Sequence, residues 1–226
     1  MAQAQSLTQT LAEFQAKRAL TMPDDRLKIN VEQRRLLVDT ADRSAFVKAG
    51  DTVQPFELTE VDTGPLSLSE LLKNGPLVLI FFRFAGCPAC NIALPYYNQH
   101  LAPELRRLGT TLVGVSPQVP EKLRDIKDRH QLDFLIATDA RNSLGRRFGI
   151  LYSFDEASRR LSVESGSPIG EVTGTGTWEL PMPAAIVIDQ SGTVRFADVS
   201  PDWLVRTEPA DIIAAVQAIT ARVATA

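Results

Sequence analysis

Residues 76–90 read Pro-Leu-Val-Leu-Ile-Phe-Phe-Arg-Phe-Ala-Gly-Cys-Pro-Ala-Cys, and this stretch decides the fold. Its first seven residues, 76–82, form a continuous apolar run of strand length, which is typical of a central strand buried on both faces. Cys87 and Cys90 follow directly, and a helical pattern begins at about residue 92. The two cysteines are therefore expected where a buried strand ends and a helix begins.

This position favours reactive thiols. The free backbone N–H groups and the dipole at a helix start stabilise an anion such as a thiolate. Cysteines of a CxxC motif in this setting can have pKa values lowered to roughly 3.5–7.5. Pro88 suits the first helical turn because it lacks an N–H, and the spacing lets the two sulfurs form a disulfide within one turn. The sequence therefore predicts a redox-active pair, Cys87 and Cys90.

Three other interpretations compete with redox chemistry. A structural zinc site needs four ligands, and the only other soft candidates are His100 and His130, both more typical of plain surface residues. Two inert buried cysteines would not need a helix start. A structural disulfide across two residues closes too small a loop to stabilise much. Redox chemistry is favoured, with no metal and no cofactor expected.

The rest of the chain supplies strands and helices around this stretch. Further strands are expected near residues 56–58 (a short edge strand), 111–115, 134–136, 184–189 and 193–197, the last two joined as a hairpin. Helices are expected at 67–73, 92–108, 121–130 and 209–223, with a kink or break where Pro95 and Pro103 interrupt the second. This order implies a mixed sheet covered by helices on both faces.

Two segments lie outside this pattern. Residues 7–48 carry apolar residues at loosely helical spacing, broken at residues 22–25, and predict a helical arm packed on, or exchanged between, protomers. Residues 153–179 are rich in Gly, Ser and Thr and are longer than an ordinary connection, so we expect a long insertion loop that is either functional or disordered. A lid over the site is one hypothesis for its function. The expected division is a helical N-terminal arm, 1–48, and a redox domain, 49–226.

Composition narrows the class of protein. The net charge is −3 and the arginine pairs are scattered, which argues against a nucleic-acid partner. The longest apolar run is far below the roughly 18 residues that span a bilayer, and the first 20 residues do not form a signal-peptide core. We therefore expect a cytoplasmic protein without membrane association. Thiols are kept reduced in that compartment, so a lone cysteine pair there favours catalysis over a structural disulfide.

Several short motifs carry a family resemblance. The stretch 78–90 is joined by Gly50-Asp51, Pro55-Phe56-x-Leu58, Leu66-Ser67-Leu68, Val113-Gly114-Val115-Ser116-Pro117-Gln118, Phe148-Gly149, Trp178-Glu179-Leu180-Pro181-Met182-Pro183, Val187-Ile188-Asp189 and Pro201-Asp202. Together they resemble the alkyl hydroperoxide reductase/thiol-specific antioxidant (AhpC/TSA) family, and within it the peroxiredoxin-like branch that carries CPxC. The resemblance covers nearly the whole chain, including the helical arm.

The resemblance implies an α/β fold of the thioredoxin-like, peroxiredoxin type, with a mixed central sheet flanked by helices. It also implies a thiol-dependent peroxidase, an antioxidant oxidoreductase that reduces hydrogen peroxide or organic hydroperoxides through a Cys87/Cys90 dithiol-disulfide cycle. The expected partners are the peroxide and a thiol electron donor, such as a thioredoxin-type protein or a low-molecular-weight thiol. The apolar residues of the arm are consistent with a homodimer.

The chain departs from the family pattern at the site itself. The peroxiredoxin motif PxxxTxxC appears here as Arg83-x-x-x-Cys87-x-x-Cys90, so proline is replaced by arginine and threonine by cysteine. Two mechanisms follow. By alignment with peroxiredoxins, Cys90 attacks the peroxide and Cys87 resolves the sulfenic acid. By the logic of thioredoxin, Cys87 is the low-pKa nucleophile and Cys90 resolves a mixed disulfide.

Four further residues are candidates for the site. Arg83 stabilises negative charge there, or is an arginine at a strand end paired with solvent or a carboxylate. Pro88 and Pro183 are expected to shape the substrate groove, and Pro183 resembles the cis-proline of thioredoxins. Trp178 lines the groove or packs in the core. The alternative functions are a thioredoxin-like protein disulfide reductase and, from another class, a redox-sensing or metal-binding module without turnover.

Overall fold

A computed structural model describes residues 5–224, with the side chains of the last helix described up to residue 219 and at residue 221. The strands are β1 (Glu57–Glu60), β2 (Gly64–Ser67), β3 (Leu77–Phe81), β4 (Thr111–Ser116), β5 (Leu135–Thr138), β6 (Leu151–Ser153), β7 (Glu179–Pro181), β8 (Ala184–Ile188) and β9 (Val194–Val199). The α-helices are α1 (Leu7–Thr21), α2 (Asp24–Thr40), α3 (Leu68–Leu71), α4 (Cys90–His100), α5 (Ala102–Arg107), α6 (Pro120–His130), α7 (Ser143–Arg147), α8 (Glu156–Glu164), α9 (Ile169–Thr173) and α10 (Pro209–Ala224). Two short 3₁₀ helices are η1 (Arg43–Ala45) and η2 (Ala140–Asn142).

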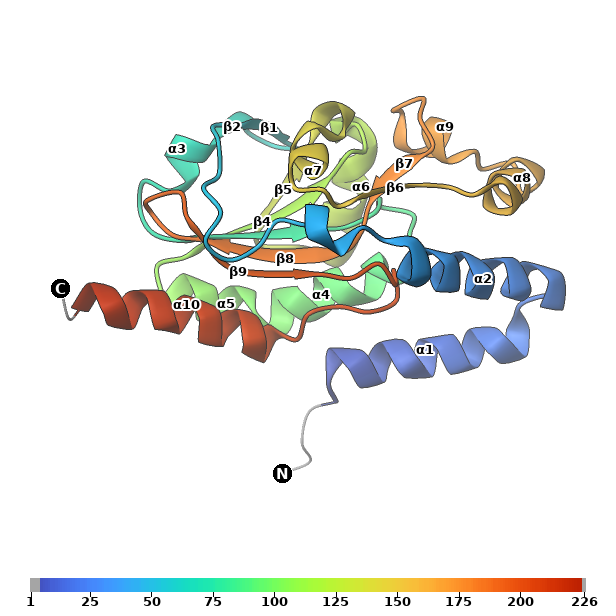
Figure 1. Ribbon diagram of the computed structural model, residues 1–226, viewed down its shortest axis with the longest axis horizontal. Helices are drawn as coiled ribbons and strands as arrows, with labels where there is room; N and C mark the ends of the chain where they lie inside the picture. Colours follow the sequence, from blue (N-terminus) through green and yellow to red (C-terminus); the bar gives the residue numbers. More distant parts are fainter. Residues whose placement is uncertain (1–4, 225–226) are drawn as a thin grey trace.

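Strand β3 is an interior strand of a seven-stranded mixed sheet, as the sequence predicts, and Figure 1 shows this sheet between two layers of helices. The strand order is β2-β1-β5-β4-β3-β8-β9. β3 pairs in parallel with β4 and antiparallel with β8. Val78 and Ile80 enter one layer of the core, and Leu79 and Phe81 enter the other. Because both faces of β3 are covered, its sequence is a continuous apolar run rather than an alternating one.

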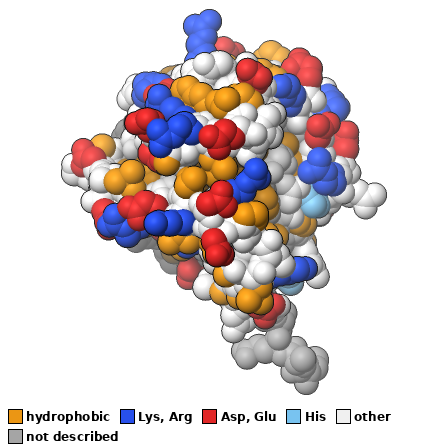
Figure 2. All heavy atoms as spheres, turned by 90° about the vertical axis from the view of Figure 1, so that its right-hand side faces the viewer, with side chains coloured by type: hydrophobic (Ala, Val, Ile, Leu, Met, Phe, Trp, Pro, Cys, Tyr) orange, Lys and Arg blue, Asp and Glu red, His pale blue; other side chains and the backbone are white. Residues whose placement is uncertain are grey.

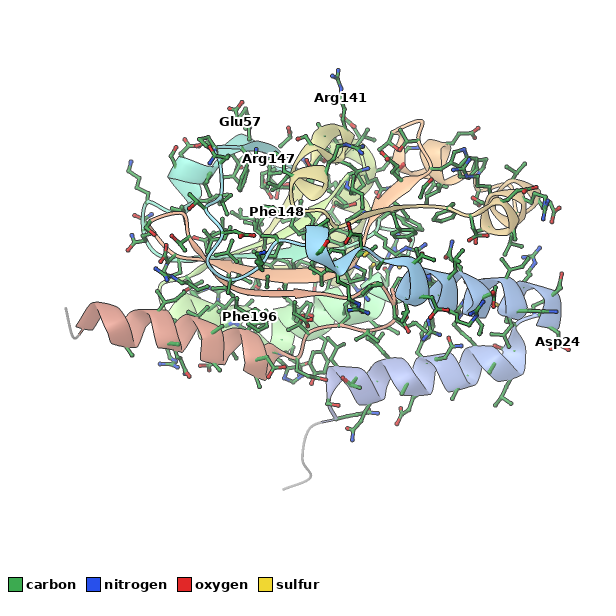
Figure 3. The ribbon with its side chains drawn as sticks, in the orientation of Figure 1. Asp24, Glu57, Arg141, Arg147, Phe148 and Phe196 are labelled. Atoms are coloured by element: carbon green, nitrogen blue, oxygen red, sulfur yellow. The ribbon has the colours of Figure 1, made fainter. Side chains whose placement is uncertain are left out.

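Helices cover both faces of the sheet, which confirms the expected architecture. Figure 1 shows α4, α5 and α10 on one side of the sheet and α3 and α7 on the other. In Figure 3, Phe148 lies on the side of α7, where it packs edge-on against Phe81, and Phe196 lies on the side of α5 and α10. The cysteines belong to the layer of the core on the side of α4, which also contains apolar residues of the N-terminal helices.

The N-terminal helices pack on the core of their own chain. α1 and α2 run side by side, separated at Met22 and Pro23 where the sequence predicts the break (Figure 1). Leu7 and Leu11 of α1 are buried against the layer that contains the cysteines. The side chain of Glu208 accepts hydrogen bonds from the backbone N–H groups of Leu7 and Thr8, an arrangement that satisfies free donors at a helix start. The division at residue 48 and the homodimer stay predictions.

Of the local expectations, two need correction and one is confirmed. β1 is not an edge strand, because the turn after it continues into β2, which forms the edge. The break expected in the helix over 92–108 is confirmed near Pro103: α4 ends at His100 and α5 begins at Ala102, so that Pro103 lies in the first turn of α5, where its missing N–H is tolerated. The segment 153–179 contains α8 and α9 instead of a loop. Asp155 caps α8 by accepting from Ser158 N–H, so polar residues typical of a loop here act as helix caps.

No helix within residues 5–224 is both long enough and apolar enough to cross a membrane.

Candidate active site

Cys87 and Cys90 lie where the loop after β3 enters α4. α4 begins at Cys90, and Cys87 precedes the first turn, held by a hydrogen bond from its N–H to the Phe84 carbonyl at 3.1 Å. The two cysteines are not bonded to each other, and each is 0% exposed. Pro88, between them, is exposed on the surface of the loop. The expected placement at a strand end and helix start is therefore found, but the sulfurs are covered.

Two amide side chains hold the loop in place. Asn91 Nδ2 donates to the carbonyls of Ala85 at 2.7 Å and Cys87 at 2.9 Å. Gln118 Oε1 accepts from the Ala85 N–H at 2.7 Å. The Asn91 Oδ1 atom is 2.7 Å from Nε2 of His130, which connects α6 to this loop. Because these bonds fix the backbone on both sides of Cys87, its sulfur has a defined position relative to β3.

Two buried arginines approach the sulfurs from different parts of the chain. Arg83 Nη1 lies 3.9 Å from Cys87 Sγ, and Arg206 Nη2 lies 3.7 Å from Cys90 Sγ. Both side chains belong to residues only 7% exposed. Arg206 is anchored by Nη1, which donates to the carbonyls of Trp203 at 2.6 Å and Val205 at 2.8 Å. The cysteine pair therefore lies between two guanidinium groups shielded from water.

These surroundings shift the pKa values of the two thiols in opposite directions. Hydrogen bonding from the Cys90 thiol, with the positive charges of Arg83 and Arg206, holds the pKa of Cys87 well below its usual range despite burial. Burial, followed by the hydrogen bond to Cys87 and the negative charge there, raises the pKa of Cys90 well above its usual range. In the reduced pair these surroundings therefore favour the negative charge on Cys87 and the proton on Cys90.

Aromatic rings surround the guanidinium of Arg83. Its Cζ atom is 4.8 Å from the ring centroid of Trp203, 5.6 Å from Phe84, 5.8 Å from Phe154 and 6.0 Å from Tyr152. The rings attract the cation through their faces and exclude water from it. Exclusion of water lowers the local dielectric constant, which strengthens the attraction between Arg83 and a thiolate. The alternative role for Arg83, pairing with solvent or a carboxylate, does not fit a side chain enclosed in this way.

Trp178 takes the second of its two expected roles, since it packs against the core, and the peptide bond before Pro183 differs from the expected one. Trp178 packs on Phe154, with ring centroids 6.3 Å apart, and is separated from Arg83 by that ring. The expectation of a cis bond at Pro183 is wrong, since no cis peptide occurs within residues 5–224. The chain runs straight into β8 there because Met182 N–H donates to the Ile150 carbonyl and the Pro183 carbonyl accepts from Ser200 N–H.

Arg206 contacts the cysteine pair, and the sequence does not reveal this. Its number places it near Asp202, a plausible partner, but Asp202 pairs with Arg34 through two bonds of 2.7 Å. Arg206 instead turns inward to Cys90. Trp203 is missed in the same way. Neither residue belongs to a motif, and their contact with the site depends on the loop after β9 folding back over α4.

The N-terminal helices cover this loop. The guanidinium carbons of Arg18 in α1 and Arg34 in α2 lie 5.5 Å and 5.7 Å from the ring centroid of Trp203. Gln33 Oε1 accepts from Trp203 Nε1 at 3.0 Å. Trp203 is therefore enclosed by arginines from the arm and from the active site. Figure 2, which looks at the molecule from the right-hand side of Figure 1, shows basic and acidic side chains interspersed over this end.

A cavity of about 340 Å³ opens between α1 and the loop at residues 204–206. Its lining is mostly apolar, with two arginines, and consists of Thr8, Leu11, Ala12, Gln15, Arg34, Leu204, Val205 and Arg206. Arg206 both lines this cavity and contacts Cys90. The side chain of Arg206 therefore separates this cavity from the sulfur of Cys90.

The two histidines take part in surface contacts of α4 and α6. His100 packs on the ring of Tyr96 at 4.3 Å, and His130 contacts Asn91. In the part of the chain that the structure describes, no three His, Cys, Asp or Glu side chains are grouped so that they could hold a metal ion.

Comparison with known proteins gives a consistent result. The model of the AhpC/TSA family matches residues 49–197, which leaves α1 and α2 outside the match. The chain is 32% identical over 104 residues to the peroxiredoxin-named protein Rv1608c of Mycobacterium tuberculosis, covering 46% of this chain and 67% of that protein. It is 28% identical over 105 residues to peroxiredoxin Bcp of Escherichia coli, covering 46% and 65%.

A solved structure supports the fold directly. The crystal structure of the peroxidoxin BcpB from Mycobacterium tuberculosis superposes with a TM-score of 0.60 at 24% identity, covering 76% of this chain and 98% of that chain. The expected thioredoxin-like, peroxiredoxin-type fold is thereby confirmed.

Proposed function

The chain belongs to the AhpC/TSA family, and from this premise we propose that it is a thiol peroxidase in which Cys87 attacks the peroxide. One observation carries the proposal: the pKa of Cys87 is lowered beside two buried guanidinium groups, while that of Cys90 is raised. The thiolate is the nucleophilic form of cysteine, and the neighbouring thiol is then the resolving group. This assignment follows the logic of thioredoxin rather than the alignment with peroxiredoxins, which favours Cys90.

The proposed cycle has three steps. The Cys87 thiolate attacks the terminal oxygen of ROOH, so an S–O bond forms, the O–O bond breaks, and the peroxide leaves as alkoxide that becomes the alcohol ROH. Cys90 then attacks the sulfur of the Cys87 sulfenic acid, which forms the disulfide and releases hydroxide, while the proton of the Cys90 thiol passes to the alkoxide. An external dithiol reduces the disulfide by exchange and is itself oxidised. Arg83 and Arg206 stabilise the negative charge that moves from sulfur to oxygen.

The covered sulfurs limit which molecules reach the site. A small peroxide needs only a small local movement of the chain to reach the sulfurs, whereas a thioredoxin-type protein needs a larger movement of the arm or of the segment 153–179. We propose that the cavity bounded by α1 and Arg206 is the approach for the peroxide, because Arg206 both lines it and contacts Cys90. The electron donor in this proposal is a thiol of a thioredoxin-type protein or of a small molecule.

Rapid mixing of the reduced protein with excess hydrogen peroxide tests the proposal. Thiol loss is followed in wild type, Cys87→Ser and Cys90→Ser. Fast loss in wild type and Cys90→Ser, but not in Cys87→Ser, is the expected result. The opposite pattern makes Cys90 the attacking thiol. Reaction of all three no faster than free cysteine would refute peroxidase activity.

A thioredoxin-like disulfide reductase is the second candidate, favoured by the low-pKa cysteine at the first position of the CxxC motif. Two observations weigh against it: the sulfurs are covered, and the peptide before Pro183 is trans. Turnover of insulin disulfides by the reduced protein, at a rate well above that of free dithiol, would favour this function.

A further inference from the structure

Two hydrogen-bond donors beside the cysteine pair have no acceptor. The Tyr152 hydroxyl and the Nε atom of Arg83 are both buried, and neither has a hydrogen-bond partner within residues 5–224. Buried polar groups are nearly always paired, so two unpaired donors in one place need a reason. Arg83 does approach Tyr152, but a guanidinium can only donate. The O–H proton of Tyr152 therefore has no acceptor there.

The surroundings fix where Tyr152 lies. It is the middle residue of β6, paired with Leu180 of β7, and is 6% exposed. Its ring stacks on Phe154 at 6.1 Å and an interplanar angle of 12°. These contacts leave the ring little freedom, so the hydroxyl is held among Arg83 and the cysteines. Both sulfurs and the guanidinium interact electrostatically with it.

Tyr152 remains protonated at neutral pH. Burial is the main cause that raises its pKa to about 12, while Arg83 opposes this shift. A phenol with this pKa is a hydrogen-bond donor throughout the physiological range. It is also acidic enough to protonate an alkoxide, which is the stronger base. The positive charge of Arg83 stabilises the phenolate that such a transfer leaves behind.

We propose that Tyr152 is a catalytic residue: together with Nε of Arg83 it binds the peroxide, and it donates its proton to the leaving oxygen. This role rests on the proposed peroxidase function. When the Cys87 thiolate takes the terminal hydroxyl of ROOH, the electron pair of the O–O bond passes to the RO oxygen. That oxygen receives the Tyr152 proton and leaves as ROH.

The proton is then restored from the second cysteine. The Tyr152 phenolate takes the proton of the Cys90 thiol. The resulting Cys90 thiolate attacks the sulfur of the Cys87 sulfenic acid and releases hydroxide. The balance is one thiolate, one thiol and one ROOH giving a disulfide, ROH and hydroxide, so no further oxidant or reductant is needed. The same phenol serves both halves of the reaction because it interacts electrostatically with both sulfurs and with the guanidinium of Arg83.

The experiment compares two electrophiles on one thiolate. Hydrogen peroxide needs a proton on its leaving oxygen, whereas iodoacetamide releases iodide, which needs none. Reduced wild type, Tyr152→Phe and the control Tyr96→Phe are mixed with each reagent, and thiol loss is followed. Tyr96 is a suitable control because its hydroxyl bonds to the Gln5 carbonyl on the surface, away from the sulfurs. The ratio of the two rates in one variant cancels any change in access to the sulfur.

Tyr152→Phe is expected to lower the peroxide rate on the order of 100-fold, as loss of one preorganised donor does. The iodoacetamide rate should stay within about threefold of wild type, and the melting temperature should not fall, because the lost hydroxyl has no partner. Equal loss with both reagents would overturn the proposal and indicate a structural role, and an unchanged peroxide rate would overturn it outright. A wild type no faster than free cysteine toward peroxide, with normal alkylation, would instead remove the peroxidase function and this role with it.

Discussion

Opening of the N-terminal arm should control access to the sulfurs, and Arg34→Ala tests this. Both cysteines are unexposed, so any reagent must wait for a local opening. Arg34 connects α2 to the loop above the site through two 2.7 Å bonds to Asp202, with side chains only 21% and 20% exposed. Its guanidinium also lies over Trp203. Loss of these contacts should favour the open form.

The size of the effect follows from the geometry. A bidentate, largely buried bond between charged groups contributes about 2 kcal/mol. At about 1.4 kcal/mol for each factor of ten, the open population should rise about 30-fold. The pKa of Cys87 is set by Cys90, Arg83 and Arg206, so the thiolate fraction should not change. When opening is fast relative to alkylation, the rate of thiol loss follows the open population.

The assay is alkylation of the reduced protein by iodoacetamide, and Arg35→Ala is the matched control. Arg35 is the next residue of α2, but its pairs with Glu32 and Asp39 are exposed to solvent and contribute little. Arg34→Ala should react about 30-fold faster than wild type, and Arg35→Ala no more than about threefold faster. If the two variants react alike, the arm does not control access, and the segment 153–179 becomes the better candidate.

Three further changes test the electrostatics of the structure. Arg206→Met removes one of the charges that lower the pKa of Cys87, so the pH midpoint of its alkylation should move to higher pH. Cys87→Ser should cost about 2 kcal/mol more stability in urea unfolding than Cys90→Ser, because it leaves the Arg83 charge buried without a counterion. Burial alone would raise the pKa of Glu60, but a lysine and three backbone N–H donors lower it from 4.5 to about 2. That carboxylate should contribute about 3 kcal/mol above pH 4.5 and lose it as the pH falls toward 2, and Glu60→Gln should remove this dependence.

Much of the fold is encoded in local patterns. The buried run at 77–81 became the central strand, and the hairpin and the last helix follow from turn residues and periodicity. The segment 153–179 contains two helices that its composition does not predict, and the reason is physical. Its Gly, Ser and Asp residues favour turns, but the same residues cap short helices, as Asp155 does for α8. Composition alone does not distinguish these outcomes.

The residues of the site also fall into two groups, those placed by local sequence and those placed by tertiary packing. Cys87, Cys90 and Arg83 fall within eight residues of one another, so a strand end and a helix start were enough to place them together. Arg206 and Tyr152 come from separate segments and meet the cysteines only through the packing of the sheet. Tyr152 directly precedes the segment 153–179, and it reaches the site because β6 pairs with β7. No spacing of residues in the sequence predicts such contacts.

The role of Arg83 shows what burial adds to a sequence position. An exposed arginine at a strand end is satisfied by water and carries no information about a neighbouring thiol. Arg83 is 7% exposed and surrounded by aromatic rings, and within residues 5–224 no carboxylate forms an ion pair with it. A buried cation needs a negative charge nearby, and the thiolate of Cys87 supplies it. The low pKa of Cys87 and the burial of Arg83 are therefore two consequences of one arrangement, in which each of the two opposite charges stabilises the other in the protein interior.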